Sequence, residues 1–118
     1  MTARSLATVL PVDDLPTAVA IYTRLLGIDP TFVDGDRWAQ FDLAGRRLAL
    51  AGSDRVSELP GLLIRVTDLA AARADAAGLG LHVGAIQAGP HEDRCVVTGP
   101  GAWPVILYAT PVPHQEQQ

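Results

Sequence analysis

The chain has 118 residues, of which 48% are hydrophobic and 19% are charged, and its formal net charge is −4. This length fits one domain that buries about two-thirds of its unfolded surface, and the hydrophobic content excludes a disordered chain. The nine basic residues are all arginines and form no stripe, which argues against nucleic acid as a partner, and no apolar run approaches the roughly 20 residues of a membrane span.

The N-terminus and the cysteine content indicate the compartment. The opening stretch "MTARSLATVLPVDD" has one Arg, a short apolar patch and an early Asp pair, which is not the pattern of a signal peptide, so we expect a cytoplasmic protein without a membrane association. Cys95 is the single cysteine, which excludes an internal disulfide and a thiolate-rich metal site. We expect its side chain to be a small buried hydrophobe.

The first predicted strand, residues 5–12, leads into a predicted helix over residues 14–26. Asp14 offers its side chain to the free N–H groups of the first turn, and Pro16 fits that turn because its missing N–H has no partner to lose. Gly27 is expected to end the helix in a left-handed conformation. The spacing of apolar residues predicts a buried stripe. This stripe consists of Val19, Tyr22, Leu25 and Leu26.

Short extended runs separated by turns follow this helix, and the second half of the chain repeats the order. The first half contains "PTFV", "RWAQFDL" and "RRLALA", with an Asp-Gly turn typical of hairpins. The second half begins with the strand "GLLIRV" and a helix over residues 68–79, with Leu69, Ala72 and Ala76 facing inward. It continues with "LHVGAIQ", "DRCVVT" and "PVILYAT".

Both strand-to-helix junctions read Val-x-Asp-Leu, as "VDDL" and "VTDL", about half the chain apart. This repeat predicts a duplicated βαβββ unit and an α+β fold. Two such units side by side give an eight-stranded curled mixed sheet, a cup with the helices outside. The predicted bounds are one module at about residues 5–52, a linker at 53–60, a second module at about 61–110 and a frayed tail at 111–118, all within a single domain.

The order of these motifs resembles the vicinal oxygen chelate superfamily, which includes glyoxalase I, extradiol dioxygenases, fosfomycin resistance enzymes and bleomycin resistance proteins. The stretch "YTRLLGI" resembles the helix end of that family, and "GPGAWPVILY" stands where the family writes a Gly-containing turn before a ligating strand. The resemblance implies a cup that holds a small molecule, and in the enzymes a divalent metal bound by His, Gln or Glu from four strands.

None of the four positions that the resemblance assigns to metal ligands carries a donor side chain. Three of them are Ala7, Gly61 and Ile106, and the fourth falls in the strand residues 47–51, Arg-Leu-Ala-Leu-Ala. These side chains have no lone pair that a divalent cation can use. We therefore expect no metal, no cofactor and no metal-dependent catalytic residue, as in the bleomycin resistance proteins.

If the former ligand positions point into the cup, strand alternation assigns the other positions. The predicted ligand-contacting residues are Trp38, Gln40, Asp42, Arg47, Arg65, Arg94, Ile106 and Tyr108. Smaller side chains lining the cup are Ala7, Val9, Pro11, Leu63 and Val96. The helix-facing set is Leu10, Val12, Ala39, Phe41, Leu43, Leu62, Ile64, Val105 and Leu107. Two simpler interpretations stay open: Trp38 as a strand aromatic at a dimer contact, and the arginines as partners of surface carboxylates.

Three functions remain in competition on the sequence. The first is a metal-free protein that binds a small molecule, such as an antibiotic or a metabolite. The second is a metal-independent glyoxalase-like lyase, isomerase or cyclase that moves protons with His91, Asp42 or Tyr108. The third is a metal enzyme whose ligands lie in another register. A homodimer is expected in each case, with the cup formed within one chain or shared between two chains.

Overall fold

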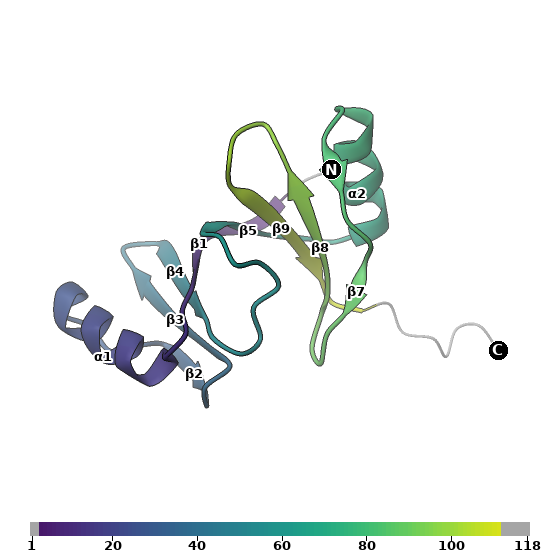
Figure 1. Cartoon of the computed structure of the whole chain (residues 1–118). Coiled ribbons are helices and arrows are strands. Elements are labelled where there is room, and N and C mark those ends of the chain that lie inside the picture. Colours follow the sequence, from purple (N-terminus) through teal and green to yellow (C-terminus); the bar gives the residue numbers. More distant parts are fainter. Residues whose placement is uncertain (1–2, 112–118) are drawn as a thin grey trace. The chain divides into compact units, whose positions relative to one another are not determined.

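A computed structural model of the chain describes residues 3–111, and it divides them into two compact units (Figure 1). One unit is Leu6–Leu63, and the other combines residues 3–5 with residues 64–111. Strands β1 (Ala3–Pro11) and β5 (Gly61–Val66) each pass from one unit into the other. Neither helix of the described part has the length and apolar character that crossing a membrane requires.

The unit Leu6–Leu63 contains most of β1, the helix α1 (Leu15–Leu26) and three more strands. These strands are β2 (Phe32–Asp34), β3 (Trp38–Leu43) and β4 (Arg46–Ala51). The strand order is β2-β3-β4-β1, with antiparallel pairing between the first three and parallel pairing of β1 with β4. The helix packs on one face of this sheet. Its core contains Leu15, Ala39, Phe41 and Leu50, with Leu10, Val12, Val19, Tyr22 and Leu26 partly buried around it.

The second unit repeats this arrangement after β5, with α2 (Leu69–Gly78) and four strands. These are β6 (His82–Val83), β7 (Gln87–Ala88), β8 (Asp93–Thr98) and β9 (Pro104–Ala109). The order β5-β9-β8-β6 matches β1-β4-β3-β2 strand for strand, and β7 is an additional short strand paired with β8. The prediction of an α+β fold made of duplicated βαβββ modules is therefore confirmed.

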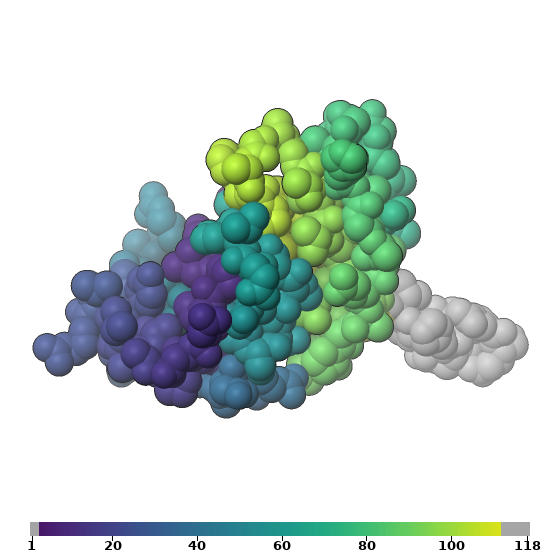
Figure 2. Space-filling model, in the orientation of Figure 1, coloured from purple at the N-terminus to yellow at the C-terminus, as the bar shows by residue number. Residues whose placement is uncertain are grey.

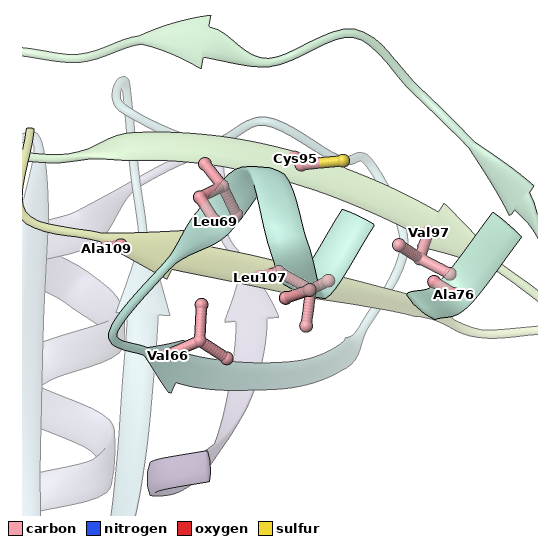
Figure 3. Packing of buried hydrophobic residues seen from close by; sticks show 8 residues of the cluster. Val66, Leu69, Ala76, Cys95, Val97, Leu107 and Ala109 are labelled. Carbon is pink, nitrogen blue, oxygen red and sulfur yellow. The ribbon is translucent and has the colours of Figure 1, made fainter. Parts of the chain in front are cut away.

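The core of the second unit lies between α2 and the sheet (Figure 3). Leu69, Ala72 and Ala76 are buried, as their spacing predicted. The buried strand residues in the same cluster are Val66, Cys95, Val97, Leu107 and Ala109. Cys95 is completely buried, so its predicted role as a small hydrophobe is confirmed.

Three details of the prediction are wrong. Leu25 is 73% exposed, because the buried stripe of α1 runs through Leu15, Val19, Tyr22 and Leu26 and leaves Leu25 on the flank that faces solvent. Figure 2 shows the chain segment that contains α1 as purple and blue spheres. Leu43 is 46% exposed, since it is the last residue of β3 and lies outside the core cluster that packs against α1.

The third error concerns the stretch "LHVGAIQ", predicted as one strand. It forms β6 and β7 with a break at Gly84, so residues 3–111 contain nine strands and not eight. The Gly84 N–H donates to the Val96 carbonyl oxygen over 2.8 Å, and a Cβ there would lie 3.2 Å from that oxygen. A glycine inside a strand pattern often marks such a close approach and interrupts the pairing. The predicted frayed tail lies outside the described residues except for Pro111.

Candidate functional site

Each unit has a sheet face that carries no helix of that unit, and strand alternation decides which side chains lie on it. In the unit Leu6–Leu63, Ala39 and Phe41 pack against α1, so the intervening residues of β3 point to the opposite, helix-free face. The register pairs Asp42 with Arg47 and Gln40 with Ala49. Four predicted site residues thus share this face: Trp38, Gln40, Asp42 and Arg47.

Asp42 and Arg47 form an ion pair on this face. Arg47 Nε donates to Asp42 Oδ1 over 2.7 Å, and the Thr31 hydroxyl donates to Asp42 Oδ2 over 2.6 Å. The hydrogen bonds from Arg47 and Thr31 lower the pKa of the Asp42 carboxyl below its ordinary value. A carboxylate stabilised in its charged form is a poor proton acceptor, so this geometry counts against Asp42 as a general base.

Phe32 lies beside Gln40 on this face, although the sequence interpretation did not assign it to the site. Phe32 lies directly opposite Gln40 in the β2–β3 pairing, and Asp34 lies opposite Trp38. Phe32 is 51% exposed, while Trp38 and Gln40 are partly buried. The stretch "PTFV" contained a signal that could have identified Phe32, namely an aromatic residue in a short predicted strand. Once the register of β2 against β3 is known, it places Phe32 on the helix-free face.

The second unit has a matching face on β8 and β9. Arg94 pairs with Tyr108 and Val96 with Ile106, while the alternate residues Cys95 and Leu107 pack towards α2. The hydroxyl groups of Ser5 and Tyr108 are 3.4 Å apart.

The two predicted arginines of this unit differ in exposure. Arg65 is exposed, between helix-facing Ile64 and Val66. Arg94 is partly buried, and a Cβ at Gly89 would lie 3.5 Å from its Nε and Nη2 atoms. Arg94 also takes part in a further polar, ring or electrostatic contact.

Three of the positions that the family resemblance assigns to metal ligands are buried and apolar. Ala7 is 5% exposed, Ile106 is 4% exposed, and Gly61 is buried. On β4, Ala49 and Leu50 are inaccessible to solvent. Among residues 3–111, no three His, Cys, Asp or Glu side chains gather where they could hold an ion. The donor set at these positions therefore does not fit a divalent metal.

A separate open pocket of about 670 Å³ lies at the N-terminal end of α1 in the unit Leu6–Leu63. It is lined by Asp13, Asp14, Leu15, Pro16, Asp36, Ser53, Arg55 and Glu58, none of which is a predicted site residue. Arg55 donates to Asp13 over 3.2 Å, to Glu58 over 3.0 Å and to the Val12 carbonyl oxygen over 3.1 Å. These bonds attach the segment after β4 to the end of β1. The polar side chains of the pocket therefore have a structural role without any ligand.

His91, the histidine considered for proton transfer, and His82 lie away from these groups in the chain. His91 is exposed in the turn between β7 and β8, and His82 is exposed on β6. No hydrogen bond connects either imidazole to another group within the described ranges.

Comparisons with known proteins place the fold among solved structures. No protein-family model matches the sequence, and no curated protein does. A Legionella pneumophila protein described as an NAD-dependent benzaldehyde dehydrogenase has a TM-score of 0.81 at 13% identity, over 91% of this chain and 100% of that chain. A glyoxalase/bleomycin resistance protein/dioxygenase superfamily member from Vibrio splendidus 12B01 has a TM-score of 0.65 at 14% identity, over 92% and 99%.

Methylmalonyl-CoA epimerase from Mycobacterium tuberculosis is also similar, with a TM-score of 0.59 at 19% identity over 100% of this chain and 97% of that chain. These proteins carry different functional names, so the likeness identifies an architecture and leaves the chemistry to the side chains. The chain shares the fold of a solved glyoxalase/bleomycin resistance protein/dioxygenase superfamily member and of a methylmalonyl-CoA epimerase, the fold that the sequence resemblance implied.

Proposed function

We propose that this chain is a small-molecule-binding protein that works without a divalent metal and sequesters an antibiotic or a metabolite. The observation that carries the proposal is the replacement of the family's ligating positions by Ala7, Gly61, Ile106 and an aliphatic stretch of β4. A Lewis-acid step needs a metal held at an open position, and these side chains cannot hold one. What the helix-free faces offer instead is aromatic surface with a few polar groups, the composition typical of small-molecule sites.

A metal-independent enzyme is the second candidate, favoured by the partly buried Tyr108, whose hydroxyl lies 3.4 Å from that of Ser5. Such an enzyme needs a group that accepts and returns a proton. Asp42 is held as a carboxylate by two donors, and Tyr108 has the Ser5 hydroxyl beside it. Tyr108 is therefore the better candidate of the two, and a turnover that survives a chelator but is lost in Tyr108→Phe would favour this function over binding alone.

The test of the proposed function is a thermal-shift screen of antibiotics and metabolites on the purified protein, followed by metal analysis. A ligand present at 100 times its Kd stabilises the folded state by about 2.7 kcal/mol, which raises the melting temperature measurably. We expect at least one such ligand, and we expect its effect to be the same with EDTA as without it. Stoichiometric zinc, nickel, manganese or iron in the purified protein, or a screen without any stabilising ligand, would contradict the proposal.

We also propose that the protein is a cytoplasmic homodimer, by extension of the sequence expectations. Sedimentation equilibrium gives the mass directly, and a mass of one chain at micromolar concentration would rule the dimer out.

A further inference from the structure

A carboxamide flanked by two aromatic side chains lies on the helix-free face of β2 and β3. Phe32 is directly opposite Gln40, and Trp38 is two residues before Gln40 on the same strand, so all three side chains leave the sheet on one side. Directly opposed residues in antiparallel strands have Cβ atoms roughly 5 Å apart, and diagonal neighbours are about 7–8 Å apart, within reach of aromatic rings. One flat molecule can therefore contact both rings and the carboxamide.

The charges beside this group are compensated within the same unit. Asp42 is bonded to Arg47 at 2.7 Å on one side, and Asp34 faces Arg37 at 3.4 Å on the other. A ligand carboxylate would compete with an existing carboxylate for its arginine, and a ligand ammonium would compete with an arginine. Electrostatics at this group therefore favours an uncharged ligand.

The Gln40 side chain is the polar group that remains available here. Its carboxamide makes no hydrogen bond within the part of the chain that the structure describes, although its backbone carbonyl accepts from Thr31. A carboxamide presents a donor and an acceptor side by side. Its best complement is a group that presents an acceptor and a donor side by side in the reverse order, as a cis-amide in a ring does.

We infer that the ligand is a neutral, planar ring system with a cis-amide edge, which stacks on Phe32 and Trp38 and forms paired hydrogen bonds with the Gln40 carboxamide. This inference rests on the proposed binding function and adds the chemical class of the ligand. Stacking supplies affinity for the ring, because aromatic pairs are stabilised beyond the area they bury. The paired hydrogen bonds supply the preference for the amide edge over a bare ring.

The experiment compares three probes of the same ring size by isothermal titration calorimetry. 2-Quinolone has the adjacent N–H and C=O, quinoline has a ring nitrogen without a donor, and quinoline-2-carboxylate has a negative charge. We expect 2-quinolone to bind about tenfold more tightly than quinoline, the ratio that one well-made pair of hydrogen bonds supplies. Quinoline-2-carboxylate should bind more weakly than both.

Variants assign this preference to the residues. Gln40→Leu should lower the affinity for 2-quinolone about tenfold and that for quinoline less, because the quinoline nitrogen accepts one hydrogen bond and donates none. Phe32→Leu should lower the affinity for both probes. The matched control is Gln87→Leu, which removes another strand carboxamide, exposed on β7 in the other unit, and should change neither affinity. Unchanged circular dichroism and melting temperature establish that each variant is folded.

Three results would overturn the inference: no preference for 2-quinolone over quinoline, tighter binding of quinoline-2-carboxylate, or an equal effect of the Gln40 and Gln87 variants. A stabilising ligand found in the thermal-shift screen whose affinity is independent of Gln40 would also overturn it, while the proposed binding function would stand. A screen that finds no ligand of any kind would contradict the binding function itself.

Discussion

Asp42 and Arg47 are opposed residues on neighbouring strands, and their ion pair gives the stability of the fold a defined pH dependence. Because Arg47 and Thr31 lower the pKa of Asp42 in the folded state, the charged carboxylate contributes stability above the ordinary carboxyl pKa. This contribution is lost as the pH falls through the lowered pKa. Asp42→Asn should therefore cost less than about 1 kcal/mol at neutral pH, since the side chain is 35% exposed, and should cost progressively less under acid.

Urea unfolding of the wild type and Asp42→Asn across the acidic range measures this dependence. Asp29→Asn is the matched control, because Asp29 is exposed and makes no hydrogen bond in residues 3–111. A difference between wild type and Asp42→Asn that grows as the pH falls would show that the ion pair does not stabilise the fold in the way the geometry indicates.

Gly52, directly after β4, is a position where the backbone leaves no room for a side chain. A Cβ at Gly52 would overlap the Asp36 carbonyl oxygen and lie 3.3 Å from the Leu15 Cβ. Gly52→Ala should therefore destabilise the protein by about 2 kcal/mol, measured by chemical denaturation. Gly78→Ala is the control, because a Cβ at that helical position meets nothing within 4 Å. It should be neutral or stabilising, as alanine is favoured over glycine in a helix.

At the scale of elements, the Val-x-Asp-Leu repeat is explained by helix capping. Asp14 Oδ1 accepts from the Thr17 N–H over 3.1 Å, and Asp68 Oδ1 accepts from the Ala71 N–H over 3.0 Å. In both places the strand ends, an aspartate satisfies a free donor of the first turn, and a buried leucine follows at the first helical position. The Val-x-Asp-Leu motif thus occurs twice because each helix starts directly after a strand and needs an N-terminal cap.

Removal of the Asp68 side chain that caps the N-terminus of α2 should destabilise the helix more than its replacement by asparagine. Asp68→Ala leaves the Ala71 N–H without its side-chain acceptor and should lower stability by about 1 kcal/mol, whereas Asp68→Asn keeps an acceptor and should cost less. Thermal unfolding followed by circular dichroism at 222 nm compares the two variants. Equal melting temperatures for Asp68→Ala and the wild type would show that the cap is not a stabilising contact.

The two βαβββ units differ in the strand that follows the helix, which is β2 in one unit and β6 with β7 in the other. In the first unit β2 pairs with β3 over three residues, and in the second the equivalent stretch divides into β6 and β7 around Gly84. Arg73 Nε donates to the Gly84 carbonyl oxygen over 2.7 Å, and this contact fixes the break against α2. The interruption is therefore a packed feature of the second unit.

For the whole molecule, the shared architecture of proteins with different names means that function depends on the side chains of each helix-free face. In this chain those faces carry apolar residues at Ala7, Gly61 and Ile106, an aromatic and carboxamide group on β2 and β3, and the ion pair between Asp42 and Arg47. We propose on this basis that the protein recognises a neutral ring without metal-assisted catalysis.

The sequence alone determined both helices, the order of the elements, the duplication and most of the strand residues that pack beneath a helix. These properties depend on local periodicity and capping, which neighbouring residues specify. Trp38, Gln40 and Asp42 share a face because strand alternation requires it, and Ala39 and Phe41 face α1 for the same reason.

Only the tertiary structure decided which side chains meet across strands. The pairing of Asp42 with Arg47 and Thr31, the place of Phe32 beside Gln40, and the exposure of Leu25 all depend on cross-strand register and on the angle at which a helix lies on its sheet. Pairing register and packing angle arise from contacts between residues distant in the sequence, so local patterns cannot specify them.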